Sequence, residues 1–324
     1  MQSPAPHPTG ASRPLVRIGT RGSALARTQA GWVQRRIAAA LGAPPEEAEA
    51  VAPLVIITTT GDRVQDRRLL EVGGKAMFTK EIEQALLDGR IDCAVHSAKD
   101  LPAEGPPGLA LAAFPEREDP RDALLTRAGL ALEDLPHGAR VGTASLRRQA
   151  QLLRRRPDLE IVMLRGNVDS RLARLDAGEM DAIVLAMAGL RRLGLDHHPH
   201  HALDPEAAPP APAQGALALQ TRDETAGAAF ARALDHIPTR LTVAAERGAL
   251  HALEGSCRTA MGAHARLEGD ALRLWVEALV ADGSDAWRQE GACAATEAEA
   301  RRLGQALGEA VRDAAGDRLE WTGA

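Results

Sequence analysis

The chain has 324 residues, of which 45% are hydrophobic, 26% charged and 2% aromatic, with no tyrosine and a net charge of −5 at pH 7. This length predicts two or three domains, and the apolar fraction predicts a soluble globular protein whose core is built of Leu, Val, Ile and Ala. The negative charge and the scarcity of aromatic side chains argue against nucleic acid or an anionic membrane as a partner.

Residues 1–14 contain no apolar segment, so we expect a short disordered tail and not a signal peptide. The longest apolar run, 182–190, is too short to span a bilayer. The three cysteines, Cys93, Cys257 and Cys293, are too widely spaced for a disulfide framework or a CxxC metal site, which indicates a reducing compartment. We therefore expect a cytoplasmic protein.

Strand-like and helical runs alternate through the first two thirds of the chain. An apolar strand over 15–20 precedes a helix that Ser23 can cap, and 54–62 is a second β-rich run that ends in a Gly-Asp turn. Apolar spacing predicts a helix over 78–89, and a short buried strand follows over 91–95.

The same alternation returns after residue 125. We expect a strand and a Ser-capped helix over 140–153, a strand and turn over 159–167, a helix over 171–180, and a strand that runs into a turn over 181–190. Strands that alternate with helices predict an α/β fold with mainly parallel sheets. Ligands of such sheets bind beyond the carboxyl ends of the strands, so the chemistry is expected in those turns.

Two stretches are predicted to be linkers between α/β halves. The first is the charged, proline-bearing segment 115–120, and the second is the Pro-, Ala- and His-rich segment 197–215. After residue 238 a helix, a strand over 272–280 and an amphipathic helix over 296–316 predict a small α+β domain.

Arginines gather between Arg140 and Arg192, where eleven Arg stand against six acidic residues. Several occupy the expected turns: Arg147, Arg148, Arg165, Arg171, Arg191 and Arg192. The helix dipole does not favour cations in a first turn, so Arg147 and Arg148 indicate a polyanionic ligand, whose carboxylates or phosphates guanidinium groups bind bidentately. Any single arginine could instead belong to a solvated basic face and bind no ligand. For the run of three arginines over 154–156, a solvated face is our prediction.

The loop over 96–102 places Lys99 beside Asp100 at the end of a predicted strand. Asp100 could be a general acid or could stabilise a cation, and Lys99 could hold an anion or lower the pKa of Asp100. A surface ion pair or a turn aspartate is the alternative. We expect His96 to be structural.

Three further features have competing interpretations. Arg21 and Ser23 at a helix N-terminus form an anion site or a simple cap. Gly73 and Gly74 indicate a flexible loop near a ligand, and the chain has no GxxxxGK[ST], which excludes a P-loop. Five histidines between 197 and 236 lack ligand spacing, so we expect no functional metal.

Cys257 follows Gly255 and Ser256 and precedes Arg258. A nearby guanidinium lowers the pKa of a thiol and permits thiolate chemistry, whereas a small buried thiol is the alternative. Cys93 is expected in the core, and Cys293 carries no such features.

An ordered series of motifs runs from about residue 15 to about 265: RIGTRGSALARTQA, TTTGDR, GGKAMFTKEIEQALLDGRIDCAVHSAKDLP, EREDPRDALL, VGTASLRRQAQL, LRGNVDSRLARLD, DAIVLAMAGLRRLGL, PAQGALAL and AAERGALHALEGSC. This series resembles the porphobilinogen deaminase (hydroxymethylbilane synthase) family of tetrapyrrole and heme biosynthesis. The C-terminal sixty residues are generic.

The resemblance implies a transferase that condenses four porphobilinogen units head to tail, losing ammonia at each step, to give the linear tetrapyrrole hydroxymethylbilane. The product grows on a dipyrromethane cofactor, which a thioether joins to one cysteine; its position in EGSC makes Cys257 that cysteine. The resemblance also implies porphobilinogen as the small-molecule partner, a monomer, and neither nucleic acid nor membrane as a partner.

The same resemblance assigns the site residues by motif. Asp100 resembles the catalytic aspartate, which would assist ammonia loss and stabilise cationic pyrrole intermediates, with Lys99 beside it. Besides Cys257, the cofactor is expected to contact Arg147, Arg148, Lys99, Ser145 and Thr143. The substrate is expected to contact Arg21, Ser23, Arg165, Arg171 and Arg192.

The family fold has two α/β domains of the type II periplasmic-binding-protein kind and a small C-terminal α+β domain that carries the cysteine. The domains implied here are a tail over 1–14, a first α/β domain over 15–115 and 214–235, a second over 120–210, and an α+β domain over 238–324. Two departures stand out: Gln220 replaces a Glu that many relatives carry, and RTAMGAHA follows Cys257 where a VPIG-like run is common.

Two other functions compete with this one. A non-enzymatic binder of small polyanions could use the same two-lobed fold, but it would need neither Asp100 beside Lys99 nor a special Cys257. A nucleic-acid binder could use the arginine cluster, but the net charge and the few aromatics oppose it.

Overall fold

The computed structural model describes residues 15–63, 77–222, 226–253 and 260–319, arranged around two five-stranded sheets and one three-stranded sheet. The expectations for the tail over 1–14, for Gly73 and Gly74 and for Cys257 lie outside these residues. The α/β class with an additional α+β part is confirmed. No helix in the described ranges is long and apolar enough to cross a membrane.

The first sheet has the strand order β2-β1-β3-β10-β4. Its strands are β1 (Ile18–Thr20), β2 (Leu54–Ile56), β3 (Cys93–Ser97), β4 (Leu109–Ala113) and β10 (Leu217–Arg222). β1 is parallel to β2 and β3, whereas β10 is antiparallel to both of its neighbours. The helices of this half are α1 (Ala24–Ala40), α2 (Ala48–Val51), α3 (Thr60–Arg63), α4 (Lys80–Leu87) and α8 (Ala226–Arg232).

The expected α1 and α4 form for the expected reasons. The Ser23 side chain caps α1 by accepting the backbone N–H of Ala26, and Val33 and Ile37 are buried one turn apart on the core-facing side. In α4, Ile82 and Leu86 repeat at helical spacing and are fully buried.

The second sheet has the order β7-β6-β8-β5-β9. Its strands are β5 (Asp122–Thr126), β6 (Arg140–Gly142), β7 (Glu160–Val162), β8 (Ala182–Ala186) and β9 (His200–Ala202), and its helices are α5 (Leu146–Arg155), α6 (Val168–Asp176) and α7 (Met187–Leu193). β6 is parallel to β7 and β8, but β5 is antiparallel to β8 and β9. Each sheet therefore contains one strand that runs against its parallel core.

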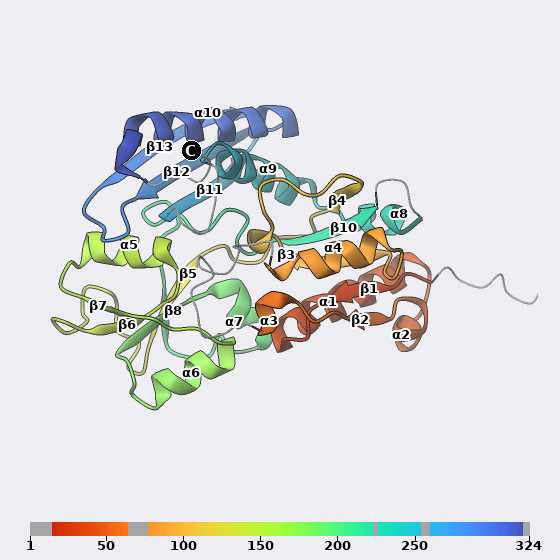
Figure 1. Cartoon of the computed structure of the whole chain (residues 1–324), viewed down its shortest axis with the longest axis horizontal. Helices are drawn as coiled ribbons and strands as arrows, with labels where there is room; N and C mark the ends of the chain where they lie inside the picture. The colour runs from red at the N-terminus through yellow and green to blue at the C-terminus, as the bar shows by residue number, and fades with distance from the viewer. Residues whose placement is uncertain (1–14, 64–76, 223–225, 254–259, 320–324) are drawn as a thin grey trace, which may run out of the picture.

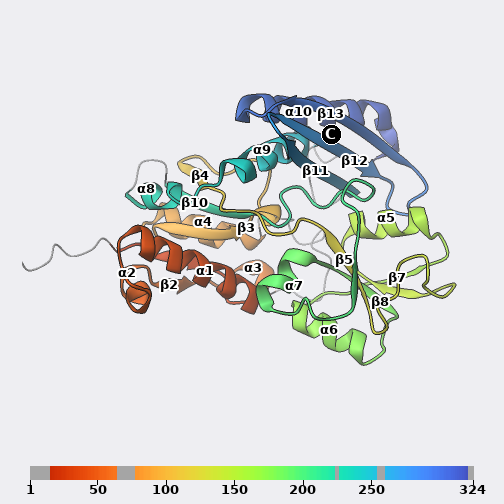
Figure 2. The same cartoon turned by 180° about the vertical axis from the view of Figure 1, so that it is seen from behind.

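The third sheet is an antiparallel meander of β11 (Ala260–Glu268), β12 (Ala271–Leu279) and β13 (Ala286–Ala294), with α9 (Ile237–Ala252) and α10 (Glu297–Ala315) packed on it. Figures 1 and 2 show these elements lying above both α/β halves. Close crossing of α9 and α10 requires glycine: a Cβ on Gly304 would lie 2.0 Å from the carbonyl oxygen of Ala245, and one on Gly248 would lie 2.5 Å from that of Arg301.

Several expected elements differ from the structure. The turn expected within 54–62 is replaced by the short helix α3, and the turn at the end of 181–190 is the start of α7. Gly189 weakens the helical pattern of α7, although a Cβ at this position would make only an ordinary van der Waals contact, 3.7 Å from Leu25 on α1. The Pro-rich segment 197–215 contains the edge strand β9.

Residues 154–156 are not a uniformly solvated face. Arg156 is half-buried and forms two hydrogen bonds of 2.7 Å to the Asp158 carboxylate. It also donates to the backbone carbonyls of Leu132, Leu135 and Pro136, so it holds the 132–136 loop against α5.

Two crossing segments join the α/β halves: the first crossing, 114–121, and the second crossing, 203–216. They contact each other through a hydrogen bond from the Glu118 N–H to the Gly215 carbonyl, at 3.2 Å. Gly215 has a φ of 89°, and a Cβ there would lie 2.3 Å from the carbonyl oxygen of Glu118. Glycine is therefore required where the crossings meet.

One buried carboxylate joins both crossings to the third sheet. Glu246 on α9 is fully buried and accepts two hydrogen bonds from Arg117 of the first crossing, at 2.8 and 2.9 Å. It also accepts the backbone N–H groups of Ala213 in the second crossing (2.6 Å) and Ala265 in β11 (2.8 Å).

Replacing Glu246 with Ala is expected to lower the free energy of unfolding by ~3–5 kcal/mol, because Arg117 would remain buried without its counter-ion. Urea unfolding followed by circular dichroism measures the loss. Glu290, which pairs with Arg273 on the exposed face of β13, is the matched control, and its replacement is expected to cost at most about 1 kcal/mol. Equal losses for the two variants would contradict the role given to Glu246.

Candidate active site between the two α/β halves

A cavity of about 480 Å³ lies between the α/β halves. It is lined by all the predicted site residues that the structure describes: Arg21, Ser23, Lys99, Asp100, Thr143, Ser145, Arg147, Arg148, Arg165, Arg171 and Arg192. The volume is in the range of small-molecule sites. The roles of these side chains stay predictions, but the sequence motifs do meet at one place.

Lys99 and Asp100 reach the cavity from the short helix η4 (Ala98–Asp100), which directly follows β3. The Lys99 ammonium donates to Oε1 of Gln214 at 3.2 Å. Burial lowers the pKa of Lys99 to about 8, and the nearby Arg148 cation acts in the same direction. Within the described part of the chain, the half-buried Asp100 carboxylate accepts no hydrogen bond, which leaves it available to a ligand.

Arg147 and Arg148, at the start of α5, have an internal counter-ion that the sequence analysis missed. Both are buried, and they lie 2.8 and 2.7 Å from the two carboxylate oxygens of Asp122. The two guanidinium groups hold the pKa of Asp122 far below its usual value. A polyanionic ligand is therefore not the whole reason for cations in this first turn.

The position of Asp122 follows from the direction of β5. Because β5 is antiparallel to β8, Asp122 at its start pairs with Ala186 at the end of β8. The beginning of β5 thus lies at the edge of the sheet where ligands bind. A search confined to the carboxyl ends of strands passes over this residue.

Three other arginines have no carboxylate partner among the described residues. Nη1 of Arg165 is buried and unpaired, Arg171 donates to the Gly166 carbonyl at 2.8 Å, and Arg192 donates to the Gly215 carbonyl at 2.6 Å. Burial lowers the pKa of Arg171 and of Arg192 to about 10. All three side chains are half-buried, and the nearby Glu118 offsets only part of the cost of charging Arg192, so these guanidinium groups are suited to a ligand that brings carboxylates.

Arg21 already has a protein partner, because it donates to Oδ1 of Asp62 at 2.5 and 3.0 Å. Its guanidinium also lies 4.2 Å from the centre of the Phe78 ring. Arg21 can add a positive field to the cavity, although its charge is partly offset.

The three hydroxyls expected to bind the ligand also organise the backbone. Ser23 and Ser145 cap α1 and α5, and Oγ1 of Thr143 accepts the N–H of Ser145 at 3.1 Å. The capping interpretation of Ser23 thus holds. Each hydroxyl acts as an acceptor in these contacts, which leaves its own proton to donate into the cavity.

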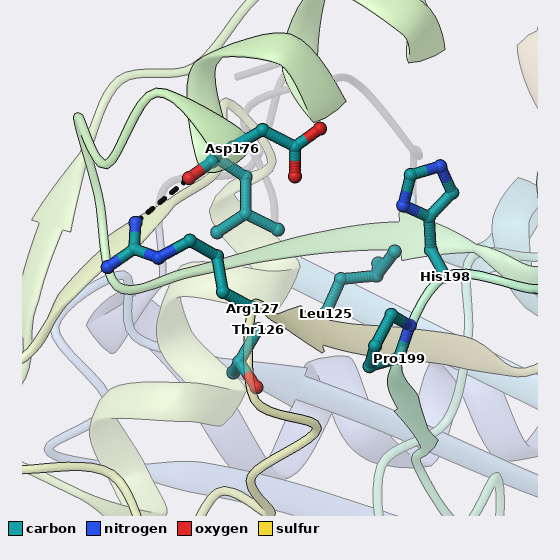
Figure 3. Close-up of a pocket in the computed structure, with 7 residues that line it drawn as sticks. Leu125, Thr126, Arg127, Asp176, His198 and Pro199 are labelled. Carbon is teal, nitrogen blue, oxygen red and sulfur yellow. Dashed lines mark hydrogen bonds between the residues drawn. The ribbon is translucent and has the colours of Figure 1, made fainter.

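A second hollow of about 280 Å³ lies at the opposite edge of the second sheet, where Thr126 pairs with Ala182 at the start of β8. Figure 3 shows its lining: Leu125, Thr126, Arg127, Leu175, Asp176, His198 and Pro199. Arg127 donates to the Leu175 carbonyl at 3.0 Å. None of the predicted site residues lines this second hollow. In the described ranges as a whole, no group of three or more His, Cys, Asp or Glu could hold a metal ion.

His96 is a buried residue of β3 in the first sheet, and its Nε2 lies 3.0 Å from Oε1 of Gln220 on the neighbouring strand β10. Burial lowers the pKa of His96 to about 4. Gln220 supplies a neutral partner where a Glu would supply a charged one, so the imidazole stays uncharged at neutral pH.

In a His96→Gln variant, the free energy of unfolding is expected to fall less steeply as the pH is lowered. The pKa of His96 is depressed in the fold, so the unfolded chain binds more protons between pH 6.5 and 4, and the free energy of unfolding falls as the pH drops through that window. A shift from 6.5 to about 4 corresponds to roughly 3 kcal/mol between these limits. Urea titrations at pH 7 and pH 4.5 measure the slope, with the exposed His137→Gln as the control. If the free energy of unfolding of His96→Gln changed with pH as much as that of the unmodified chain, His96 would not be the cause of the acid sensitivity.

Comparisons with known proteins place the chain in a family. Residues 16–229 match the family model "Porphobilinogen deaminase, dipyromethane cofactor binding domain", and residues 240–313 match "Porphobilinogen deaminase, C-terminal domain". A relative from Phenylobacterium zucineum named porphobilinogen deaminase is 63% identical over 316 residues, covering 95% of this chain and 99% of the relative. A relative of the same name from Caulobacter vibrioides is 61% identical over 315 residues, covering 95% and 98%.

Solved structures overlap only loosely. The aliphatic sulphonate binding protein SsuA of Escherichia coli gives a TM-score of 0.41 at 17% identity, covering 74% of this chain and 70% of that one. A periplasmic binding protein of Brucella ovis gives the same score and identity, covering 74% and 68%. The assignment comes from the two family models, which together span both α/β halves and the third sheet, and from the curated relatives: the chain belongs to the porphobilinogen deaminase family.

Proposed function

We propose that this protein is a porphobilinogen deaminase: a cytoplasmic, monomeric transferase that condenses four porphobilinogen units, with loss of ammonia, into hydroxymethylbilane. The observation that supports this most is the set of cations around one cavity. Arg165, Arg171 and Arg192 lack an internal carboxylate among the described residues, and each pyrrole of the substrate carries an acetate and a propionate. The Asp100 carboxylate faces the same cavity.

The side chains present fit a dipyrromethane cofactor, because its carboxylates match the cations that line the cavity. Lys99, Arg147 and Arg148 would hold its carboxylates, and Thr143 and Ser145 would donate hydrogen bonds. Cys257, outside the described residues, would bind it through a thioether. When bound, the cofactor supplies the covalent end on which the product is assembled.

The protein's own side chains would have two roles, substrate binding and stabilisation of positive charge. Arg21, Arg165, Arg171 and Arg192, with Ser23, would bind and orient the acetate and propionate of the incoming substrate. Asp100 would lie at the aminomethyl group and stabilise the positive charge that develops as ammonia leaves, which is most effective in a cavity shielded from water. The proposed domains are the three named above: 15–115 with 214–235, 120–210, and 238–324.

Intact mass tests this function directly. We expect the purified protein to carry an adduct of two pyrrole units and a Cys257→Ser variant to carry none. An unmodified protein would be incubated with porphobilinogen and weighed again. If no adduct formed even then, the protein would be a binder of small polyanions and not a deaminase.

Arg165→Gln is expected to weaken substrate engagement with little loss of stability, since Arg165 has no carboxylate partner in the part of the chain that the structure describes. One charge-assisted hydrogen bond contributes about 1.5–3 kcal/mol, which predicts a rise in KM of ten-fold or more. Steady-state kinetics measures this. Arg174→Gln, on the exposed face of α6 with Glu179 as its partner, is the matched control. A KM like that of the control would exclude Arg165 from the substrate site.

A further inference from the structure

Gln214 is a buried amide at the junction of the two α/β halves. It is 1% exposed and lies in the second crossing, three residues before β10, whose first residue Leu217 pairs with Ser97 at the end of β3. This pairing brings Gln214 to Lys99, although 115 positions separate them in the sequence.

The amide of Gln214 contacts both halves at once. Its Nε2 donates to the Pro120 carbonyl of the first crossing at 2.7 Å and to Oδ1 of Asp122 at 2.9 Å. Its Oε1 accepts the Lys99 ammonium at 3.2 Å. Both amide protons and the amide oxygen are therefore used, and the orientation of the amide is fixed because only Oε1 can accept from Lys99.

Four charged side chains act on Lys99 at this place. Arg147 and Arg148 on α5 disfavour its charged form, whereas Asp122 on β5 and Asp100 on η4 favour it. Asp122 is already shared by the two arginines. The one hydrogen bond that Lys99 makes within the described residues is to Gln214.

Gln214 places a neutral amide between the Lys99 ammonium and the Asp122 carboxylate, where a glutamate would add a third charge. Gln214 gives the Lys99 ammonium an acceptor without neutralising it, and it donates to Asp122 where a glutamate would repel it. The charge of Lys99 thus stays available to a carboxylate in the cavity, and Asp122 stays with the arginines.

We propose that Gln214 is a positioning residue of the deaminase reaction: it fixes Lys99 beside Asp100 and keeps its ammonium unpaired with any carboxylate until cofactor or substrate arrives. This proposal rests on the proposed function. The lowered pKa of Lys99, about 8, supports it, because an ammonium with a carboxylate partner would hold its proton more tightly.

The titration of Lys99 tests the proposal without turnover. Full-length chains are prepared in a Cys257→Ser background, which the mass measurement must show to be free of adduct. Lys99 is acylated with acetic anhydride between pH 6.5 and 10, and its rate is read from peptide masses. With Gln214 in place, we expect the acylation rate of Lys99 to show an inflection near pH 8. The pH of this inflection should rise by about 1 unit or more in Gln214→Glu, which adds a carboxylate, and should fall in Gln214→Leu, which removes the acceptor.

Gln149→Glu is the control variant, because it adds the same charge on α5 at a side chain that donates to the Ala281 carbonyl and does not line the cavity. The Lys99 inflection is expected to stay in place there. Equal inflections in Gln214→Glu and Gln149→Glu would overturn the proposal. Should Gln214→Glu fail to fold, Gln214→Leu decides alone: an unchanged inflection in it overturns the proposal equally.

Kinetics in chains that retain Cys257 supply a second readout. We expect Gln214→Leu to raise KM more than it lowers kcat, because Lys99 would lose its orientation toward carboxylates while Asp100 is kept. A fall in kcat alone would contradict a role through Lys99. If no adduct ever forms on Cys257, the proposed function fails, whereas the Lys99 titration still decides whether Gln214 acts on Lys99.

Discussion

Asp100→Asn is expected to lower turnover by ~10²–10⁴-fold, the range contributed by a positioned acid–base group, while the covalent cofactor stays attached. Asparagine keeps the size and shape of the side chain but removes the negative charge. In the structure this carboxylate lines the cavity and accepts no hydrogen bond among the described residues, so its oxygens are available to a ligand there. The loss should therefore appear in kcat, with a smaller change in KM.

Two measurements make this result specific to the charge at Asp100. Intact mass must show the adduct in the variant, which separates slow turnover from failed cofactor assembly. Asp169→Asn is the matched control, since Asp169 lines the same cavity but is exposed on α6. Near-normal turnover in Asp100→Asn would remove Asp100 from the mechanism, and an equal loss in both variants would point to the net charge of the cavity instead.

Asp122→Ala is expected to lower the free energy of unfolding by ~3–5 kcal/mol, because Arg147 and Arg148 would both remain buried without a counter-ion. The pKa of Asp122 is depressed in the fold, so its stabilisation is present at neutral pH. That stabilisation declines as the pH falls below about 4, where the unfolded aspartate takes up its proton. Urea unfolding at pH 7 measures the loss.

A double-mutant cycle identifies the cause of that loss. Combining Asp122→Ala with Arg148→Met removes one of the two stranded cations, so we expect the pair of changes to cost less than the sum of the single ones. Asp285→Ala, which breaks an exposed pair with Arg318, is the surface control, with an expected cost of at most about 1 kcal/mol. Strict additivity in the cycle would show that Asp122 and Arg148 do not depend on each other.

Much of the candidate site could be predicted from the sequence because its residues follow strands that are parallel. Lys99 and Asp100 come after β3, Thr143 and Ser145 come after β6, and Arg165 comes after β7. The carboxyl ends of parallel strands meet at one edge of a sheet, so locating the strands located these side chains.

Asp122 and Gln214 were not predictable in this way. Each lies at or before the start of a strand, β5 or β10, that is antiparallel to its neighbours, and this direction reverses which end faces the cavity. β5 and β10 are short and almost wholly buried, so they lack the alternation that marks a half-exposed antiparallel strand. Their direction is set by pairing with residues far away in the chain, which local pattern does not encode.

The remaining misses have local causes. The helix α7 was taken for a turn: Gly189 lowers its helical propensity, but the helix forms and buries Met187, Ala188 and Leu190. Arg156 was taken for a solvated cation because it belongs to a run of three arginines, but its partners, Asp158 and the 132–136 loop, are defined only by the folded backbone.

The place of β10 also has a consequence for how the protein is made. β10 lies between β3 and β4 inside the first sheet, but the ribosome synthesises it after every strand of the second sheet. When residues 15–113 have emerged, their sheet still lacks an interior strand, whereas the second sheet is complete once β9 is made. We therefore expect the second half to fold first on the nascent chain, and the N-terminal half to close only after residue 222 leaves the exit tunnel.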